Sequence, residues 1–98
     1  MRGIIFYKNQ ENGRRQFQQI IENYKQLTIK TIRIITSNNY DEAVFDNGDI
    51  WKAVNFGNSR GQRCNIAYVE WTITKEEIST VIEPMATLKP YHAIHIFY

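Results

Sequence analysis

The chain has 98 residues, a mass of 11.6 kDa and a formal net charge of +2. This length predicts a single domain, residues 1–98, and excludes most large enzymes. The small net charge does not by itself indicate a nucleic-acid partner. Its one cysteine, Cys64, excludes an internal disulfide framework and a multi-thiolate zinc site. No apolar run is long enough to span a membrane, and the first residues are too quickly polar for a signal peptide, so we expect a cytoplasmic protein.

The first third of the chain predicts a strand, a helix and a second strand. Gly3–Tyr7 is a continuous apolar run, which is typical of a strand buried on both faces. The polar segment Lys8–Gly13 is expected to form a loop. In Arg14–Lys25 apolar residues recur at i, i+3, i+4 and i+7, which predicts a helix with Asn12 as its N-cap. Thr28–Thr36 is mostly β-branched and predicts a strand.

The middle of the chain predicts a β-hairpin. Asn47 and Gly48 both accept positive φ angles, so they are expected to close a two-residue turn. Its arms would be Ala43–Asp46 and Asp49–Val54. The polar segment Asn55–Asn65 is expected to be a loop.

The last third predicts a strand, a helix and a final strand. Ile66–Trp71 is an apolar run that predicts a strand. Thr74 and Glu77 have the spacing of a capping box, and apolar residues at helical spacing follow them. Pro84 is expected to kink or end this helix, and Tyr91–Tyr98 alternates as a strand does.

The element order is therefore β-α-β-(β-hairpin)-β-α-β, which defines an α/β domain. We expect a mostly parallel, P-loop-like sheet in which residues 4–7, 29–35, 66–70 and 92–97 are the main strands. The alternative is a ferredoxin-like α+β fold with an extra hairpin. An antiparallel pairing of Ile66–Glu70 with Gly3–Tyr7 would favour that alternative.

Few residues support catalysis. Cys64 could serve as a nucleophile beside a histidine, but His92 and His95 are three residues apart and face opposite sides of a strand. The same spacing argues against a metal pair. We therefore expect neither metal nor cofactor.

The charges are unevenly distributed along the chain. Residues 1–33 carry +5, residues 34–51 carry −4, residues 52–63 carry +3 and residues 64–98 carry −2. Two basic loops result, and we predict that their arginines bind phosphate, since the first would lie at a helix N-terminus. These candidate anion-binding residues are Arg14, Arg15, Arg60 and Arg63.

Three stretches together resemble the ATPase domain of phage large terminases, the P-loop motors that package DNA. Val44–Ile50 resembles the family's "F-x-NGS-x-I" hairpin, and Arg60-Gly61 resembles its "RG". Ile66–Glu70 resembles the Walker B strand, at the family's spacing from "RG". The resemblance covers residues 43–85 and implies a phage- or prophage-type protein.

The catalytic residues of that family are missing. Glu70 stands where the resemblance places the magnesium-binding Asp, and Trp71 stands where it places the catalytic Glu. Lys8–Arg15 occupies the place of G-x-x-x-x-G-K-[ST] and retains only Gly13 and a cationic Arg14. We therefore expect no ATP hydrolysis.

Two functions follow as hypotheses. In the first, the chain binds nucleic acid or a nucleotide without hydrolysing it, and exposed aromatic side chains stack on bases. The candidates for stacking are Trp51, Phe56 and Trp71. In the second, the chain is a protein-binding module that regulates a host or phage enzyme, or pairs with its own copy, through a sheet edge or an acidic hairpin. The acidic candidates are Asp41, Glu42, Asp46 and Asp49.

Overall fold

The chain folds around one six-stranded sheet, and the structure, a computed structural model, describes residues 1–59 and 61–98. The strands are β1 (Arg2–Tyr7), β2 (Thr31–Thr36), β3 (Tyr40–Phe45), β4 (Ile50–Asn55), β5 (Ile66–Glu70) and β6 (Ala93–Phe97). The helical elements are α1 (Gln10–Gln26), the 3-10 turn η1 (Phe56–Asn58), α2 (Lys75–Glu77) and the π-helical turn η2 (Ile78–Ile82). The predicted order of elements is confirmed. The Cα radius of gyration of 12.6 Å is that of one compact domain of this length.

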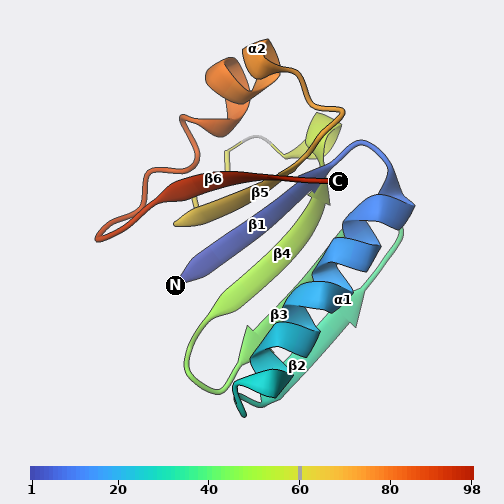
Figure 1. Cartoon of the computed structure of the whole chain (residues 1–98), viewed down its shortest axis with the longest axis vertical. Helices are drawn as coiled ribbons and strands as arrows, with labels where there is room; N and C mark the ends of the chain where they lie inside the picture. The colour runs from blue at the N-terminus through green and yellow to red at the C-terminus, as the bar shows by residue number, and fades with distance from the viewer. Residues whose placement is uncertain (60) are drawn as a thin grey trace.

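The sheet is mixed and has the order β2-β3-β4-β1-β5-β6 (Figure 1). β1 lies at its centre and pairs in parallel with both β4 and β5, and β5 pairs in parallel with β6. β3 is antiparallel to β2 and to β4. The ferredoxin-like alternative required an antiparallel pairing of β5 with β1, and the observed pairing is parallel.

The expected strand at residues 29–35 has the expected direction, because β2 is antiparallel to β3, and β3 is antiparallel to β4, which is parallel to β1. It pairs only with β3, however, and lies at the edge of the sheet, apart from the strands that pair in parallel. The hairpin strand β4 occupies the place beside β1 instead. β4 buries Trp51, Ala53 and Val54, whereas every residue of β2 from Ile32 to Thr36 is exposed.

Two hydrophobic cores cover the two faces of the sheet. On one face, α1 packs Phe17, Ile20 and Tyr24 against β1, β3 and β4. On the other face, Ile82 of η2 and Met85 pack against β1, β4 and β5. Each face is thus covered over only part of its width, as the placement of α1 and α2 in Figure 1 shows.

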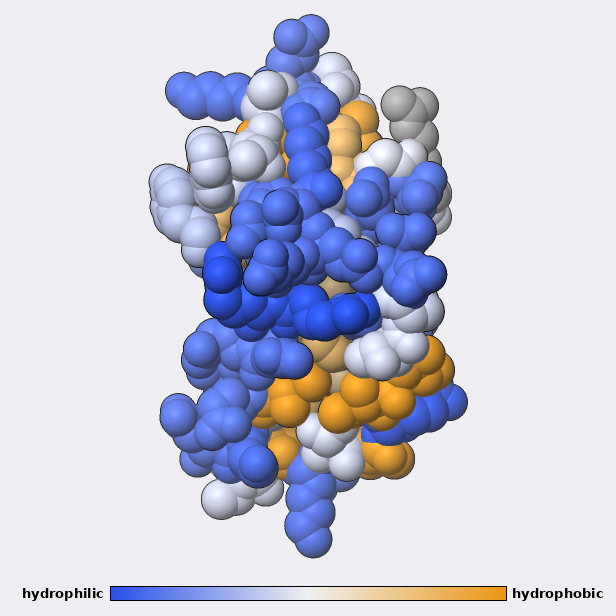
Figure 2. Space-filling model, turned by 90° about the vertical axis from the view of Figure 1, so that its right-hand side faces the viewer, coloured by the Kyte–Doolittle hydropathy of each residue, from blue (hydrophilic) through white to orange (hydrophobic). Residues whose placement is uncertain are grey.

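The edge strand β2 leaves apolar side chains exposed. Ile32, Ile34 and Ile35 are 65%, 50% and 41% exposed. Figure 2 shows the side of the molecule that carries α1 and this edge, where an apolar area interrupts a largely polar surface in the lower half.

Helix α1 begins earlier than predicted. It starts at Gln10 rather than at Arg14, and its N-cap is Asn9, whose side chain accepts a hydrogen bond of 3.1 Å from the Asn12 N–H. Gly13, expected at the end of a loop, lies inside the helix and is buried. A Cβ atom at Gly13 would lie 2.2 Å from Cδ2 of Tyr7, so the glycine allows the helix to approach β1 closely.

The turn predictions are confirmed in position and corrected in detail. The hairpin loop spans four residues, 46–49, with Gly48 at φ 93° and Asn47 outside the left-handed region, so it is not the two-residue turn we expected. The capping box of Thr74 and Glu77 is present, and the helical stretch ends at Ile82, before Pro84.

Gly13→Ala tests the close approach of α1 to β1. Alanine in a helix interior normally stabilises by about 1 kcal/mol relative to glycine, but here we expect a loss of about 2 kcal/mol because the new methyl group overlaps the Tyr7 ring. Urea unfolding measures the difference. The control Gln18→Ala, on the exposed side of the same helix, should be neutral or slightly stabilising. A more stable Gly13→Ala protein would contradict this packing.

Candidate anion-binding site

The Glu70 carboxylate connects the carboxyl end of β5 to the loop between β1 and α1. Its Oε1 accepts hydrogen bonds from the backbone N–H of Lys8 at 2.7 Å and of Asn9 at 3.0 Å, and from Thr72 Oγ1 at 2.9 Å. Its Oε2 accepts one from Asn12 Nδ2 at 2.6 Å. The side chain is fully buried. Four donors thus surround one carboxylate.

These contacts keep Glu70 ionised. Burial by itself raises the pKa of the carboxyl, but the hydrogen bonds from Asn12, Lys8, Asn9 and Thr72 outweigh it, and the pKa of Glu70 is lowered. The Glu70 side chain is therefore negatively charged in the folded protein at neutral pH.

This network occupies the place at which the sequence suggested a phosphate loop. The N–H groups of Lys8 and Asn9, which directly follow β1, point at the chain's own carboxylate. The Lys8 ammonium is also engaged: it forms an ion pair with Glu77 at 2.7 Å and lies 5.6 Å from the centre of the Phe56 ring. These two N–H groups are therefore already bound to Glu70 rather than free to bind a phosphate.

Of the four arginines predicted to bind phosphate, those on α1 make contacts within the chain. Arg14 lies in the second turn of the helix and pairs with Asp41 at 3.2 Å, and it also donates to the Ser37 carbonyl at 2.7 Å. Arg15 donates to Asn12 Oδ1 at 2.8 Å. The expectation that both lie at the helix N-terminus is wrong because α1 begins at Gln10. Arg60 lies outside the described residues.

Arg63 lines a basic cavity that is separate from the one lined by Arg14, Arg15 and Glu11 on α1. It lies in the segment before β5, and its guanidinium donates to Thr87 Oγ1 at 3.0 Å. The cavity has a volume of about 360 Å³ and opens on the face of the sheet opposite α1. We call it the basic pocket; its lining residues are Arg2, Gly3, Ile4, Ile50, Lys52, Gly61, Gln62, Arg63 and Leu88.

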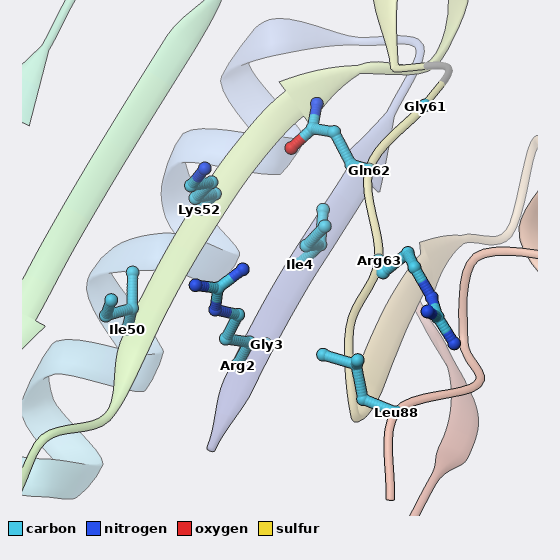
Figure 3. Close-up of a pocket in the computed structure, with 9 residues that line it drawn as sticks. All are labelled: Arg2, Gly3, Ile4, Ile50, Lys52, Gly61, Gln62, Arg63 and Leu88. Carbon is cyan, nitrogen blue, oxygen red and sulfur yellow. The ribbon is translucent and has the colours of Figure 1, made fainter.

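The register between β1 and β4 brings two further cations into the basic pocket. Arg2 lies opposite Ile50 and Ile4 lies opposite Lys52, so all four side chains project from one face of the sheet. Figure 3 shows the Arg2 guanidinium and the Gln62 carboxamide on the Lys52 side of the pocket, whereas the Arg63 guanidinium points the other way.

Among the described residues that line the basic pocket, Arg2, Lys52 and Arg63 are cationic and none carries a carboxylate. Within the described part of the chain, the Arg2 side chain has no ion-pair partner, and Lys52 has only Glu42 at 4.0 Å, the outer limit of an ion pair. Gln62 Oε1 is buried and accepts no hydrogen bond from the described residues. The pocket therefore offers positive charge and an unused hydrogen-bond acceptor.

The three candidates for base stacking lie in different parts of the structure and differ in exposure. Trp51 is buried under α1, where its Nε1 donates to the Tyr24 hydroxyl at 3.0 Å, so it is a core residue. Phe56 is half-buried beside Lys8. Trp71 is 58% exposed at the carboxyl end of β5. None of the three lines the basic pocket.

The acidic candidates do not form one surface. Asp41 is buried and bound to Arg14, which joins α1 to β3. Glu42 follows it on the strand, so it faces the other side of the sheet, where it pairs with Arg33 at 3.1 Å. Asp49 accepts a hydrogen bond of 2.6 Å from the Tyr24 hydroxyl, and Asp46 is exposed in the hairpin loop.

The residues considered for catalysis occupy ordinary structural positions. Cys64 is buried, and burial raises the pKa of its thiol to about 11, so it is protonated at neutral pH. His95 packs edge-on against the Tyr68 ring, 5.4 Å away. Residues 1–59 and 61–98 hold no group of three or more His, Cys, Asp or Glu side chains placed to bind a metal ion.

Comparisons of the chain with protein-family models, with curated proteins and with solved structures find no match. The resemblance to terminases therefore stays a hypothesis. Within the part of the chain that the structure describes, no helix is long and apolar enough to cross a membrane.

The residues of the basic pocket were not singled out from the sequence, with the exception of Arg63. Arg2 and Lys52 lie 50 residues apart and meet only through the parallel pairing of β1 with β4. A usable signal was present in β4, where the charged Lys52 stands between Trp51 and Ala53, which are both buried. A charge in that place marks a strand with one side open to water.

Glu70→Gln tests the buried carboxylate. We expect the free energy of unfolding to fall by about 2–3 kcal/mol, because an amide accepts fewer of the surrounding donors. Since the pKa of Glu70 is lower when folded than its unfolded value of about 4.3, its stabilisation is present above that pH and is lost as pH falls through the folded pKa.

Urea unfolding between neutral and acidic pH measures both effects. The Glu70→Gln protein should lose less stability than the wild type on acidification. Glu76→Gln, an exposed carboxylate, is the matched control and should leave the stability nearly unchanged. Equal acid sensitivity of the Glu70→Gln protein and the wild type would contradict this role.

Proposed function

We propose that this chain is a non-catalytic binding module that holds the phosphate of a nucleic acid or nucleotide in the basic pocket. The observation that carries the proposal is the convergence of Arg2 and Lys52 on one face, with Arg63 at the rim and no described carboxylate in the lining. Such cations attract phosphate, and a concave site holds it better than scattered surface charges do.

The hydrogen-bonding character of the basic pocket favours a nucleotide unit over a simple inorganic anion. The unpartnered Gln62 Oε1 accepts N–H or O–H donors, and bases and sugars carry such donors beside the phosphate. A volume of about 360 Å³ lies at the small end of the range for ligand sites, which suits one nucleotide unit.

The basic pocket also continues into a second cavity, beyond the space that one nucleotide fills. A second cavity of about 610 Å³ shares Gly61, Gln62 and Arg63 with the basic pocket and extends along Val81 and Met85. Arg63 thus contributes to both cavities. This arrangement favours a strand of nucleic acid that passes over residues 61–63 as the ligand.

We also propose that this domain is a P-loop-like domain that lacks the catalytic residues of that fold. In support of it, β1 is followed by a helix and pairs in parallel with β5, and the acidic residue that ends β5 contacts the loop after β1. In this chain the acid binds the loop directly, which argues for binding without hydrolysis.

Two further points support a non-catalytic role. Glu70 is buried and its oxygens are taken by four donors, so it is not positioned to orient a water or a metal ion. Trp71 has no acid or base group. Binding of a protein through the acidic hairpin is the weaker alternative, because Asp41 is buried against Arg14.

Alanine substitutions in the basic pocket test the proposal. We expect Arg2→Ala and Lys52→Ala each to weaken binding of a fluorescent single-stranded oligonucleotide about tenfold and to reduce the salt dependence of log K by about 0.7 per lost phosphate contact. Fluorescence anisotropy over a series of salt concentrations measures both quantities.

Controls of equal charge accompany these variants. Lys25→Ala removes an exposed cation on α1, and Arg15→Ala removes a candidate that lies outside the pocket, so both should leave affinity nearly unchanged. If Arg15→Ala weakens binding as much as Arg2→Ala does, the ligand uses α1 rather than the basic pocket. If the wild type binds neither oligonucleotide nor nucleotide at low salt, the proposed function is wrong.

A further inference from the structure

The face of the sheet opposite α1 continues past the basic pocket onto β3 and β2. β3 buries every second residue on the α1 side and leaves Tyr40, Glu42 and Val44 partly exposed on the opposite face. Ile50 and Lys52 of β4, which line the basic pocket, are also partly exposed there. α1 lies on the other face of these strands, as Figure 1 shows. We call the area over β1 to β4 on the side away from α1 the open face.

The strand register lines up four side chains across the open face. Arg33 of β2 is opposite Val44 of β3, and Val44 is opposite Ile50 of β4. Ile50 is in turn opposite Arg2 of β1. Paired residues project from the same face of a sheet, so this row has two apolar side chains in its middle and an arginine at each end. Because neighbouring strands lie about 4.8 Å apart, the row spans about 14 Å.

The open face carries more positive than negative charge. The described charged side chains that project from its four strands are Arg2, Arg33, Lys52 and Glu42. Glu42 lies 3.1 Å from Arg33 and 4.0 Å from Lys52. One carboxylate does not neutralise three cations, and the Arg33 side chain is 60% exposed. The open face is therefore complementary in charge to a polyanion.

We propose that a single strand of nucleic acid crosses the open face, from the basic pocket over Ile50 and Val44 to Arg33. This inference rests on the proposed function and names the form of nucleic acid that is bound. Arg2 and Arg33 contact phosphates at the two ends of the row, and the apolar pair between them contacts bases or sugars.

The apolar middle of the row favours a single strand over a duplex. Bases in a duplex are stacked on one another, whereas the faces of unpaired bases are free to pack on protein side chains. Val44 and Ile50 supply an apolar surface for such contact. A free nucleotide fills the basic pocket alone and does not reach Arg33 across the sheet.

Glu42 competes with the ligand for the cations of the open face. Its carboxylate contacts both Arg33 and Lys52, so phosphates of a bound strand have to share these two side chains with it. Replacing the carboxylate by an amide removes this competition and raises the net positive charge of the surface. The arrangement therefore predicts opposite effects for removal of Arg33 and for removal of the Glu42 charge.

Arg33→Ala tests the far end of the row. We expect it to weaken binding of a fluorescent single-stranded oligonucleotide several-fold and to reduce the salt dependence of log K by about 0.7, the value for one phosphate contact on a single strand. Binding of a mononucleotide should be unchanged. The matched control is Lys8→Ala, because Lys8 is also a partly exposed cation paired with a carboxylate, but lies beyond the other end of β1 from Arg2. It should alter neither affinity.

Glu42→Gln provides a variant that gains affinity, so its result does not depend on a loss of folding. It should strengthen binding of the same oligonucleotide and leave mononucleotide binding less affected. Annealing the oligonucleotide to its complement supplies the duplex for comparison, which the wild type should bind more weakly than the single strand. Fluorescence anisotropy measures all of these affinities.

The outcomes separate this inference from the proposed function. If Arg2→Ala weakens oligonucleotide binding and Arg33→Ala does not, the basic pocket stands and the path across the open face is wrong. The path is also wrong if Arg33→Ala weakens mononucleotide binding equally, if Glu42→Gln fails to strengthen oligonucleotide binding, or if the duplex binds as tightly as the single strand. A wild type that binds no nucleotide and no oligonucleotide overturns both proposals.

Discussion

The buried carboxylate of Glu70 is the interaction on which the centre of this structure depends. It satisfies backbone N–H groups at the end of β1, the Asn12 side chain at the start of α1 and Thr72 after β5. A buried charge is tolerated only when hydrogen bonds replace its hydration, and here four donors do so. The contacts align the carboxyl ends of β1 and β5 and set the beginning of α1, from which the close packing of Gly13 on Tyr7 follows.

Incomplete cover of the sheet explains where binding surfaces lie. α1 protects one face near β1, β3 and β4, and the segment with η2 protects the other face near β1, β5 and Val54 of β4. The face opposite α1 is therefore open beside Ile50 and Lys52, in the first part of β4, and the basic pocket lies there. The edge strand β2 has exposed side chains on both faces. The basic pocket thus lies on a face of the sheet and does not itself include the exposed edge strand β2, which the proposed single strand reaches only at Arg33.

Much of the fold could be predicted because it depends on local pattern. The apolar run of β1, the helical spacing in α1, the hairpin at Gly48 and the capping box at Thr74 are all read from neighbouring residues, and all are present. The start of α1 was missed because Asn9 and Asn12 are equivalent as N-caps by sequence. Glu70 decides between them by binding the Asn12 side chain, a contact across 58 residues.

The sequence by itself determined the order of elements, the single domain and the uneven distribution of charge. Only the tertiary structure decided which cations meet. The arginines of α1 are occupied by Asp41 and Asn12, whereas Arg2 and Lys52 meet because β4, and not β2, pairs with β1. The physical reason is that secondary structure follows from spacing along the chain. A binding site depends on strand order, which is set by the burial of side chains on both faces of the sheet.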